Sequence, residues 1–228
     1  MCFSATASFI SGSTLCVVGV ATLKQTVSNS ERPFAMIPLL FGVQQLIEGV
    51  IWLTFSHDFP AVRQVMTYLY SFFSHVLWPI YMPFAILALE AVRWRRKVLF
   101  TFEAVGITVG LYLLFYLLSS PVVAEVIGNH IVYVSPHFYV IQMMVFYVAA
   151  ACVSCFFSSH RFIKIFGALL LISFIVSYIM YIVALVSIWC FFAAILSFVI
   201  YFHFRFTDRS AGNNVPLVLP LSDSIIIA

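Results

Sequence analysis

Charged residues are scarce in this sequence. Of its 228 residues only 8% are Asp, Glu, Lys or Arg, whereas 64% are hydrophobic and 18% aromatic. Soluble domains carry about 25% charged residues, so this chain lacks the polar surface that a water-exposed fold needs. The mean hydropathy of +1.10 agrees with this view. We therefore expect an integral membrane protein that forms one helical bundle, with no room for a separate soluble domain.

The cysteines are too few and too scattered for a disulfide-stabilised secreted domain. They lie at Cys2, Cys16, Cys152, Cys155 and Cys190. Cys152 and Cys155 form a Cys-x-x-Cys motif, but it lies inside a hydrophobic run. Packing of small side chains explains that pair better than redox or metal chemistry does.

Long hydrophobic runs predict an all-α fold, a bundle of seven transmembrane helices. A helix that crosses a bilayer needs about 20 apolar residues. Runs of this kind lie at 5–23, 34–55, 66–91, 98–119, 138–158, 162–182 and 186–206. The stretch from Ile165 to Phe202 is too long for one span, so we place a tight turn inside it. Residues 1–206 form the predicted membrane domain, and 207–228 form a predicted cytoplasmic tail.

Lysine and arginine fall almost entirely on one set of loops. Only Arg63 lies in a loop of the opposite set. The other ten are Lys24, Arg32, Arg93, Arg95, Arg96, Lys97, Arg161, Lys164, Arg205 and Arg209. Cytoplasmic loops carry an excess of Lys and Arg, so this pattern predicts an N-terminus outside and a C-terminus in the cytoplasm.

Polar and ionisable residues inside a span are costly, which makes them candidates for function. In the second predicted span Gln44, Glu48 and Trp52 are spaced i, i+4 and i+8, so they share one helix face. Gln45 lies beside that face. The spacing predicts a ligand-binding surface built around an acid and two amides.

The third predicted span carries a second polar face, formed by Ser71, His75 and Trp78. Glu48 lies about eight residues below the outer end of its span and His75 about nine, so at about 1.5 Å per residue their depths match. Because a short loop joins the two spans, they should be antiparallel neighbours. We therefore expect a Glu48–His75 pair in the outer half of the membrane.

Further polar residues are predicted at the same depth. Ser177 and Tyr181 are spaced i, i+4 in the sixth predicted span, with Tyr178 adjacent. All three are assigned to the ligand-binding surface. Ser4 and Thr6, at the uncharged N-terminus, are expected to lie at this level too.

Three stretches of the sequence resemble an uncharacterised family of bacterial integral membrane proteins, a domain of unknown function. They are the opening MCFSATASF, the segment FGVQQLIEG and the segment SIWCFFAA. The resemblance implies a polytopic protein of the bacterial cytoplasmic (inner) membrane. It implies no activity, substrate or assigned site.

Metal chemistry has weaker support in the sequence. The alkaline ceramidase and adiponectin-receptor superfamily holds zinc with a Ser-x3-His, an intramembrane Asp and a late His-x3-His. Ser71 and His75 match the first element, but no Asp lies in any predicted span and the last one has only His203. No cofactor is predicted, although Glu48, His75 and a loop histidine, His130 or His137, would make a three-ligand zinc site.

Three functions remain open at this point. The first is binding or translocation of a small ligand or protons, with Glu48 as the proton-sensitive group. The second is a metal-dependent hydrolase acting on lipid in the outer leaflet. The third is a non-catalytic structural or assembly subunit whose polar groups tie helices together. Expected partners are membrane lipid and a small molecule or proton, and not nucleic acid. The oligomeric state, and whether the protein is an enzyme, stay open.

Overall fold

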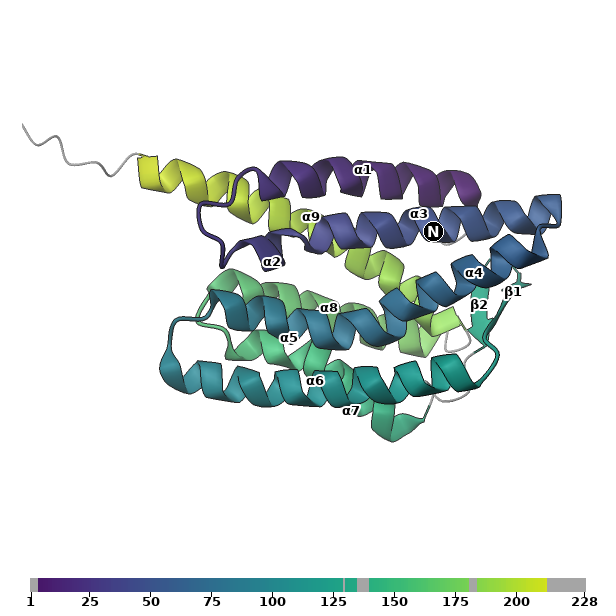
Figure 1. The fold of residues 1–228 in the computed structure, drawn as a ribbon. Coiled ribbons are helices and arrows are strands. Elements are labelled where there is room, and N and C mark those ends of the chain that lie inside the picture. Colours follow the sequence, from purple (N-terminus) through teal and green to yellow (C-terminus); the bar gives the residue numbers. More distant parts are fainter. Residues whose placement is uncertain (1–3, 129, 135–139, 181–183, 213–228) are drawn as a thin grey trace, which may run out of the picture.

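The computed structural model describes residues 4–128, 130–134, 140–180 and 184–212, which form a helical bundle with a small hairpin at one end (Figure 1). The helices are α1 (Ala5–Leu23), α2 (Arg32–Ala35), α3 (Ile37–His57), α4 (Pro60–Ser71), α5 (Trp78–Leu89), α6 (Arg93–Ser119), α7 (Ile141–Ala151), α8 (Arg161–Met180) and α9 (Leu185–Gly212). A π-helix, η1 (Phe72–Leu77), joins α4 to α5, and a 3₁₀ segment, η2 (Val153–Phe157), follows α7. The strands are β1 (Val123–Ile127) and β2 (His130–Val134).

Six helices are long and apolar enough to cross a membrane, so the prediction of a helical integral membrane protein is confirmed. They cover Ala5–Leu23, Arg32–His57, Pro60–Leu89, Arg93–Ser119, Arg161–Ile179 and Leu185–Phe206. Each overlaps one predicted span, in the predicted order. The span predicted at 138–158 contains the shorter apolar helix Ile141–Phe157. The seven-span count therefore remains a prediction.

The short segment formed by α7 and η2 runs between the two ends of the bundle. It starts on the side of the hairpin, which follows α6. It finishes beside the α5–α6 connection, where the Ser159 amide donates to Glu90 at 2.6 Å and Arg95 donates to the Ser158 carbonyl at 2.8 Å.

Close helix packing depends on small residues. A Cβ atom at Gly42 of α3 would lie 2.8 Å from the backbone nitrogen of Cys16 on α1. A Cβ atom at Gly106 of α6 would overlap the carbonyl oxygen of Pro79 on α5. Small residues at such positions let two helix backbones approach closely within lipid.

The π-helix η1 lies just before Pro79, between α4 and α5. The Trp78 amide bonds to the Phe73 carbonyl, five residues back. The next bond of this type would join residue 79 to Ser74, but proline has no N–H. The hydroxyl of Tyr147 on α7 donates to the Ser74 carbonyl instead, at 2.5 Å. Ser74 and His75, both in this π-helix, are buried in the bundle interior.

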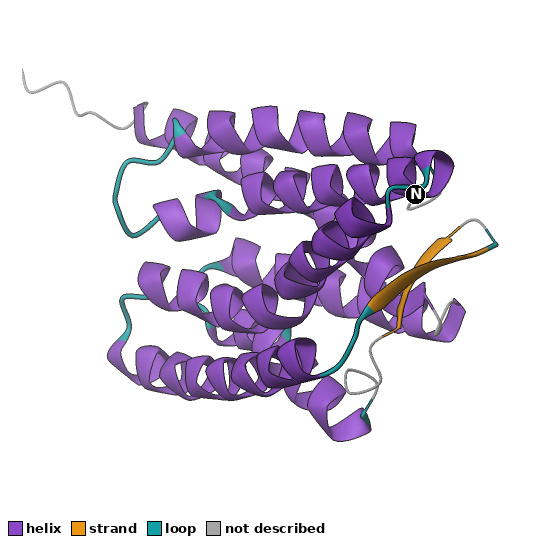
Figure 2. Ribbon diagram, turned by 45° about the vertical axis from the view of Figure 1, so that its right-hand side comes forward, coloured by secondary structure: helices purple, strands orange, loops and turns teal. Residues whose placement is uncertain are grey.

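The antiparallel hairpin β1–β2 was not predicted, because the sequence analysis assigned these residues to an outer loop. Its register pairs Val123 with Val134 and Ile127 with His130, and Gly128 at the turn has φ 63°. Figure 2 shows the two strands at one end of the helical bundle. The side chains of Ile131 and Tyr133 are buried, so the hairpin packs into the helices rather than extending from them.

The basic connections gather at the opposite end of the bundle from the hairpin. Figure 1 shows the α1–α2 loop, the α5–α6 loop and the C-terminal part of α9 at one end, with the N-terminus and the hairpin at the other. The last helix extends to Gly212, beyond the predicted boundary at 206. The rest of the predicted tail, 213–228, lies outside the described residues.

Candidate functional site

Glu48 lies in the middle of α3 and has no exposed surface. The Ser187 hydroxyl on α9 donates to its Oε1 at 2.7 Å, and the Tyr133 hydroxyl on β2 donates to the same oxygen at 3.5 Å. These donors come from segments far from Glu48 in the sequence. One carboxyl group therefore joins α3, α9 and the hairpin inside the bundle.

Tyr133 closes the site on the side of the hairpin. Its ring stacks on Tyr70 of α4, with centroids 4.3 Å apart and an interplanar angle of 9°. Both tyrosines are buried. Neither tyrosine was predicted as a site residue: Tyr133 lies on a strand where a loop was expected, and Tyr70 lies outside the polar face predicted for its helix. The alternation in HIVYV would have placed Ile131 and Tyr133 on one face of a strand.

Gln44 and Trp78, both predicted site residues, meet across the bundle. The Trp78 indole N–H donates to Gln44 Oε1 at 2.7 Å. The Trp78 ring also stacks on Phe41, with centroids 3.9 Å apart. This contact fixes the amide of Gln44 next to α5. It brings together one residue from each of the two predicted polar faces.

The glutamine amides provide polar groups that the protein itself leaves available. Gln44 and Gln45 are buried. Within the described ranges, neither amide atom of Gln45 has a hydrogen-bond partner, and nor does Gln44 Nε2. A buried amide without a hydrogen bond costs about 1–3 kcal/mol. These groups are suited to hold a small polar molecule beside Glu48.

His75 is held mainly by its own helix. Its Nδ1 lies 2.8 Å from Ser74 Oγ and 3.1 Å from the carbonyl oxygen of Ser71. The side chain is buried. The packing of α3 against α4 confirms that these helices are neighbours. A direct Glu48–His75 pair stays a prediction.

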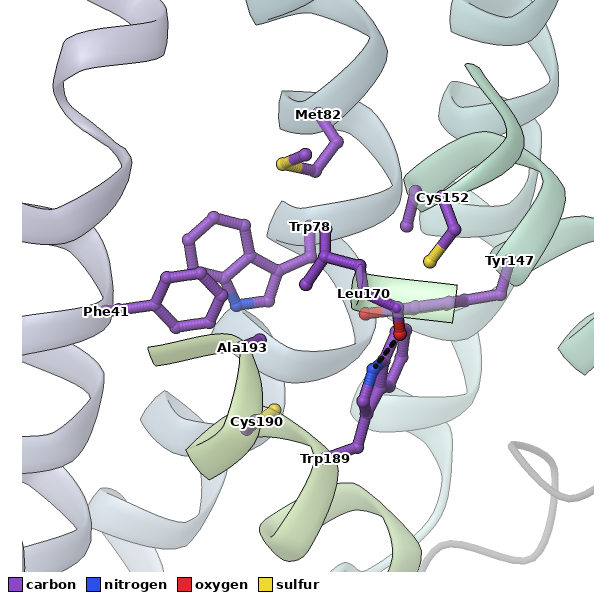
Figure 3. Close-up of a pocket in the computed structure, with 10 residues that line it drawn as sticks. Phe41, Trp78, Met82, Tyr147, Cys152, Leu170, Trp189, Cys190 and Ala193 are labelled. Atoms are coloured by element: carbon purple, nitrogen blue, oxygen red, sulfur yellow. Dashed lines mark hydrogen bonds between the residues drawn. The ribbon is translucent and has the colours of Figure 1, made fainter. Parts of the chain in front are cut away.

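Cys190 connects the polar site to a small cavity. Its thiol lies close to the side chains of Gln44, Glu48 and Tyr70. The cavity measures about 30 Å³, and Figure 3 shows aromatic and sulfur-containing side chains around it. Its lining comprises Phe41, Trp78, Met82, Tyr147, Ala151, Cys152, Leu170, Trp189, Cys190 and Ala193. One water molecule occupies about 30 Å³ in the liquid, so nothing much larger fits in this conformation.

Comparison with known proteins assigns the chain to a family. A family of unknown function (DUF6629) matches residues 1–214. The chain belongs to this family. No curated protein and no solved structure matches it. The resemblance to a family of unknown function is thus confirmed, and the family supplies no activity, so the site must be interpreted from its geometry.

Two predicted residues on α8 have local roles. Ser177 is buried, and its hydroxyl donates to the Ser173 carbonyl of the same helix at 2.8 Å. Tyr178 is 37% exposed and stacks on Phe174. Tyr181 lies outside the described residues. The structure therefore gives the proposed α8 stripe no link to Glu48 within the part that it describes.

Other predicted residues lie at the margins of the site. Trp52 is partly buried and Ser71 fully buried, and neither the Trp52 indole N–H nor the Ser71 hydroxyl has a hydrogen-bond partner among residues with described positions. Ser4 is exposed and caps α1 by accepting from the Ala7 amide at 3.2 Å. Thr6 is exposed as well, so these two hydroxyls do not reach the Glu48 site.

The zinc hypothesis gains no support from side-chain clustering. No group of three or more His, Cys, Asp or Glu side chains placed to hold a metal ion occurs in the described part of the chain. Of the proposed ligands, Glu48 and His75 are buried among the partners given above. His137 lies outside the described residues, so the zinc hypothesis stays untested.

Proposed function

We propose that this protein binds and exchanges protons at Glu48, together with a small polar ligand held by Gln44 and Gln45. One observation carries the proposal: a fully buried carboxyl accepts two hydroxyl hydrogen bonds, and on the same helix Gln44 Nε2 and both amide atoms of Gln45 are buried with no hydrogen-bond partner in the described ranges. Ionisable residues within the membrane mark ion, proton or ligand pathways in many transporters and pumps.

The orientation that we propose has seven spans, an outer N-terminus and a cytoplasmic C-terminus, in the cytoplasmic membrane of a bacterium. The clustering of basic loops at one end of the bundle supports this orientation. The path of α7 and η2 supports the seventh crossing, because Ser159 meets Glu90 at that basic end. Glu48 then lies nearer the outer surface, below the hairpin.

The dimensions of the site favour a proton or a very small solute. The adjoining cavity of about 30 Å³ has room for roughly one water molecule. A lipid or sugar substrate would require the helices to separate. The structure thus gives a specific reason to rank proton and small-ligand binding above lipid hydrolysis.

Proton exchange is tested in sealed vesicles that contain the purified protein and a pH-sensitive dye. With an imposed pH gradient, the wild-type protein should dissipate the gradient faster than empty vesicles do. Glu48→Gln should reduce this rate to that of empty vesicles, whereas Ser197→Ala should leave it unchanged. Ser197 is a suitable control because it is buried on α9 like Ser187 but donates to the Ala194 carbonyl.

Two outcomes contradict the proposal. Wild-type flux equal to that of empty vesicles would remove proton translocation, and Glu48→Gln flux equal to wild-type flux would place the pathway elsewhere. A variant that loses only thermal stability would favour the structural-subunit hypothesis.

Ligand binding is tested separately by thermal unfolding with a panel of small amides and polyols. A compound that raises the wild-type melting temperature should lose this effect in Gln45→Leu, because that change removes both amide groups. If Gln45→Leu responds to such a compound as the wild-type protein does, the amides do not form the ligand site.

A further inference from the structure

A basic pocket lies at the end of α5 and the start of α6, away from the Glu48 site. It has a volume of about 440 Å³ and is lined by Leu87, Arg93, Arg96, Lys97 and Phe100. Three cationic side chains therefore surround a space with apolar residues at its edges. Small-molecule sites typically occupy about 300–1,000 Å³, so this pocket can hold a headgroup-sized ligand.

The pocket lies at the level of lipid headgroups. The apolar part of α6, from Val98 to Ser119, has about 22 residues and a length of about 33 Å at 1.5 Å per residue. This length matches the hydrocarbon core of a bilayer, about 30 Å. The first turn of α6 must then project into the interface. Trp94 in that turn is 56% exposed, as is usual for aromatic residues at the membrane surface.

Two of the three positive charges of the pocket are not paired with groups of the described protein. Arg96 is held in place because its guanidinium donates to the carbonyls of Leu87 at 3.1 Å and Glu90 at 2.9 Å. Arg93 and Lys97 are exposed, and their side chains make no hydrogen bond or ion pair with any residue that the structure describes.

The nearby acidic group does not neutralise the pocket. Glu90 is only 1% exposed. Its carboxylate accepts from the backbone amides of Val92 at 2.9 Å and Ser159 at 2.6 Å, so it faces the connecting loops. The pocket therefore retains three positive charges. Arg96 is hydrogen-bonded to the backbone, whereas Arg93 and Lys97 are not paired with any described residue.

We propose that this pocket binds the phosphate headgroup of an anionic phospholipid from the surrounding membrane. Guanidinium groups bind phosphate oxygens through paired, charge-assisted hydrogen bonds. Basic pockets between helices on the cytoplasmic side are suited to such headgroups. Phe100 is 65% exposed and lies one turn deeper than Arg96, where it contacts the glycerol region and the first part of an acyl chain.

The test uses the purified full-length protein in mild detergent and native mass spectrometry. Phosphatidylglycerol should bind as a discrete adduct, at least tenfold more tightly than phosphatidylcholine. Arg93→Gln combined with Lys97→Gln should weaken phosphatidylglycerol binding at least tenfold. Arg161→Gln combined with Lys164→Gln is the matched control, because it removes the same charge at the same end of the bundle from α8.

Two further measurements test whether positive charge is sufficient for binding and whether the bound phosphate belongs to a lipid or to free inorganic phosphate. Arg93→Lys with Lys97→Arg should retain binding, since it keeps both positive charges. Inorganic phosphate at millimolar concentration should not displace the lipid. Equal weakening in the α8 control, no preference for phosphatidylglycerol, or displacement by inorganic phosphate would each overturn the proposal.

Discussion

At the scale of single residues, the bond from Ser187 to Glu48 should stabilise the bundle measurably. Ser187→Ala removes a buried donor from a carboxyl group and should lower the free energy of unfolding by about 1–3 kcal/mol. Reversible unfolding in mixed detergent micelles measures this change. The comparison variant is Ser197→Ala, which should cost less because the Ser197 hydroxyl donates to a carbonyl of its own helix at 2.6 Å. Equal losses in the two variants would contradict a specific role for Ser187.

Helical spacing explains why some site residues were predictable. Gln44 and Glu48 are four residues apart, which places them on one helix face, and the sequence alone shows this. Trp78 was assigned to the facing surface for the same reason. Ser187, Tyr70 and Tyr133 were missed, because their importance comes from contacts between segments that are distant in the chain. A lone serine or tyrosine in an apolar run carries no local sign of such a partner.

At the scale of helices, the contact between α5 and α6 leaves no room for a side chain at Gly106. Gly106→Ala would place its methyl group against the Pro79 carbonyl, so the helices must move apart, at a cost of about 1–3 kcal/mol. Detergent unfolding is again the measurement. Gly128→Asn is the control, because nothing lies within 4 Å of that position and Asn tolerates a positive φ. If Gly128→Asn lowers the free energy of unfolding as much as Gly106→Ala does, the packing argument is contradicted.

The loops at the basic end contain a carboxylate that should make stability depend on pH. Burial alone would raise the pKa of Glu90, but the backbone hydrogen bonds from Val92 and Ser159, with nearby His160, outweigh it and lower the pKa. A lowered pKa in the folded state means that Glu90 stabilises the protein above the ordinary Glu value of about 4.3. This stabilisation is lost as the pH falls through the lowered pKa.

The variant Glu90→Gln tests this dependence. At pH 7 it should be less stable than the wild-type protein by about 1–3 kcal/mol, because a charge-assisted hydrogen bond is lost. The difference should shrink as the pH falls through the lowered pKa of Glu90, because the wild-type carboxyl then becomes protonated as well. Unfolding measured across this range gives the comparison. A difference that does not vary with pH would contradict the role assigned to the Glu90 charge.

Two elements were not predicted from the sequence. The π-helix at Phe72–Leu77 depends on Tyr147, a residue of another helix, which satisfies the Ser74 carbonyl. The hairpin combines β-branched residues with a Gly-Asn turn, which is a recognisable signal. This hydrophobic segment lies between two predicted membrane spans and was therefore assigned to the loop that connects them. The burial of Tyr133 shows that it belongs to the core.

At the scale of the whole molecule, the topology depends on whether α7 and η2 cross the membrane, as we propose. Glu125→Cys on the hairpin should react with a membrane-impermeant maleimide in intact cells. His160→Cys, just after η2, should react only once the membrane is permeabilised. Both positions are exposed in the structure. The unmodified chain measures the background labelling of its own cysteines. Labelling of both positions from the same side would show that this segment does not cross.

Hydrophobic runs predicted most of the helical architecture at this scale. Six predicted spans correspond to long apolar helices, because a membrane allows few alternatives to a helix for such runs. The segment at 138–158 is the exception. Its α-helix ends at Ala151 and a 3₁₀ segment follows at Val153–Phe157, a change that the hydropathy pattern does not record.

The central claim is that Glu48 exchanges its proton, and infrared spectroscopy of the protein in lipid vesicles tests it most directly. Difference spectra between acidic and alkaline buffer should contain a carboxylic C=O band that is absent in Glu48→Gln. In Ser187→Ala that band should shift in frequency, because the carboxyl group loses a hydrogen-bond donor. A Glu48 band that stays constant across every pH at which the protein remains folded would contradict the account and leave Glu48 as a structural tie between helices.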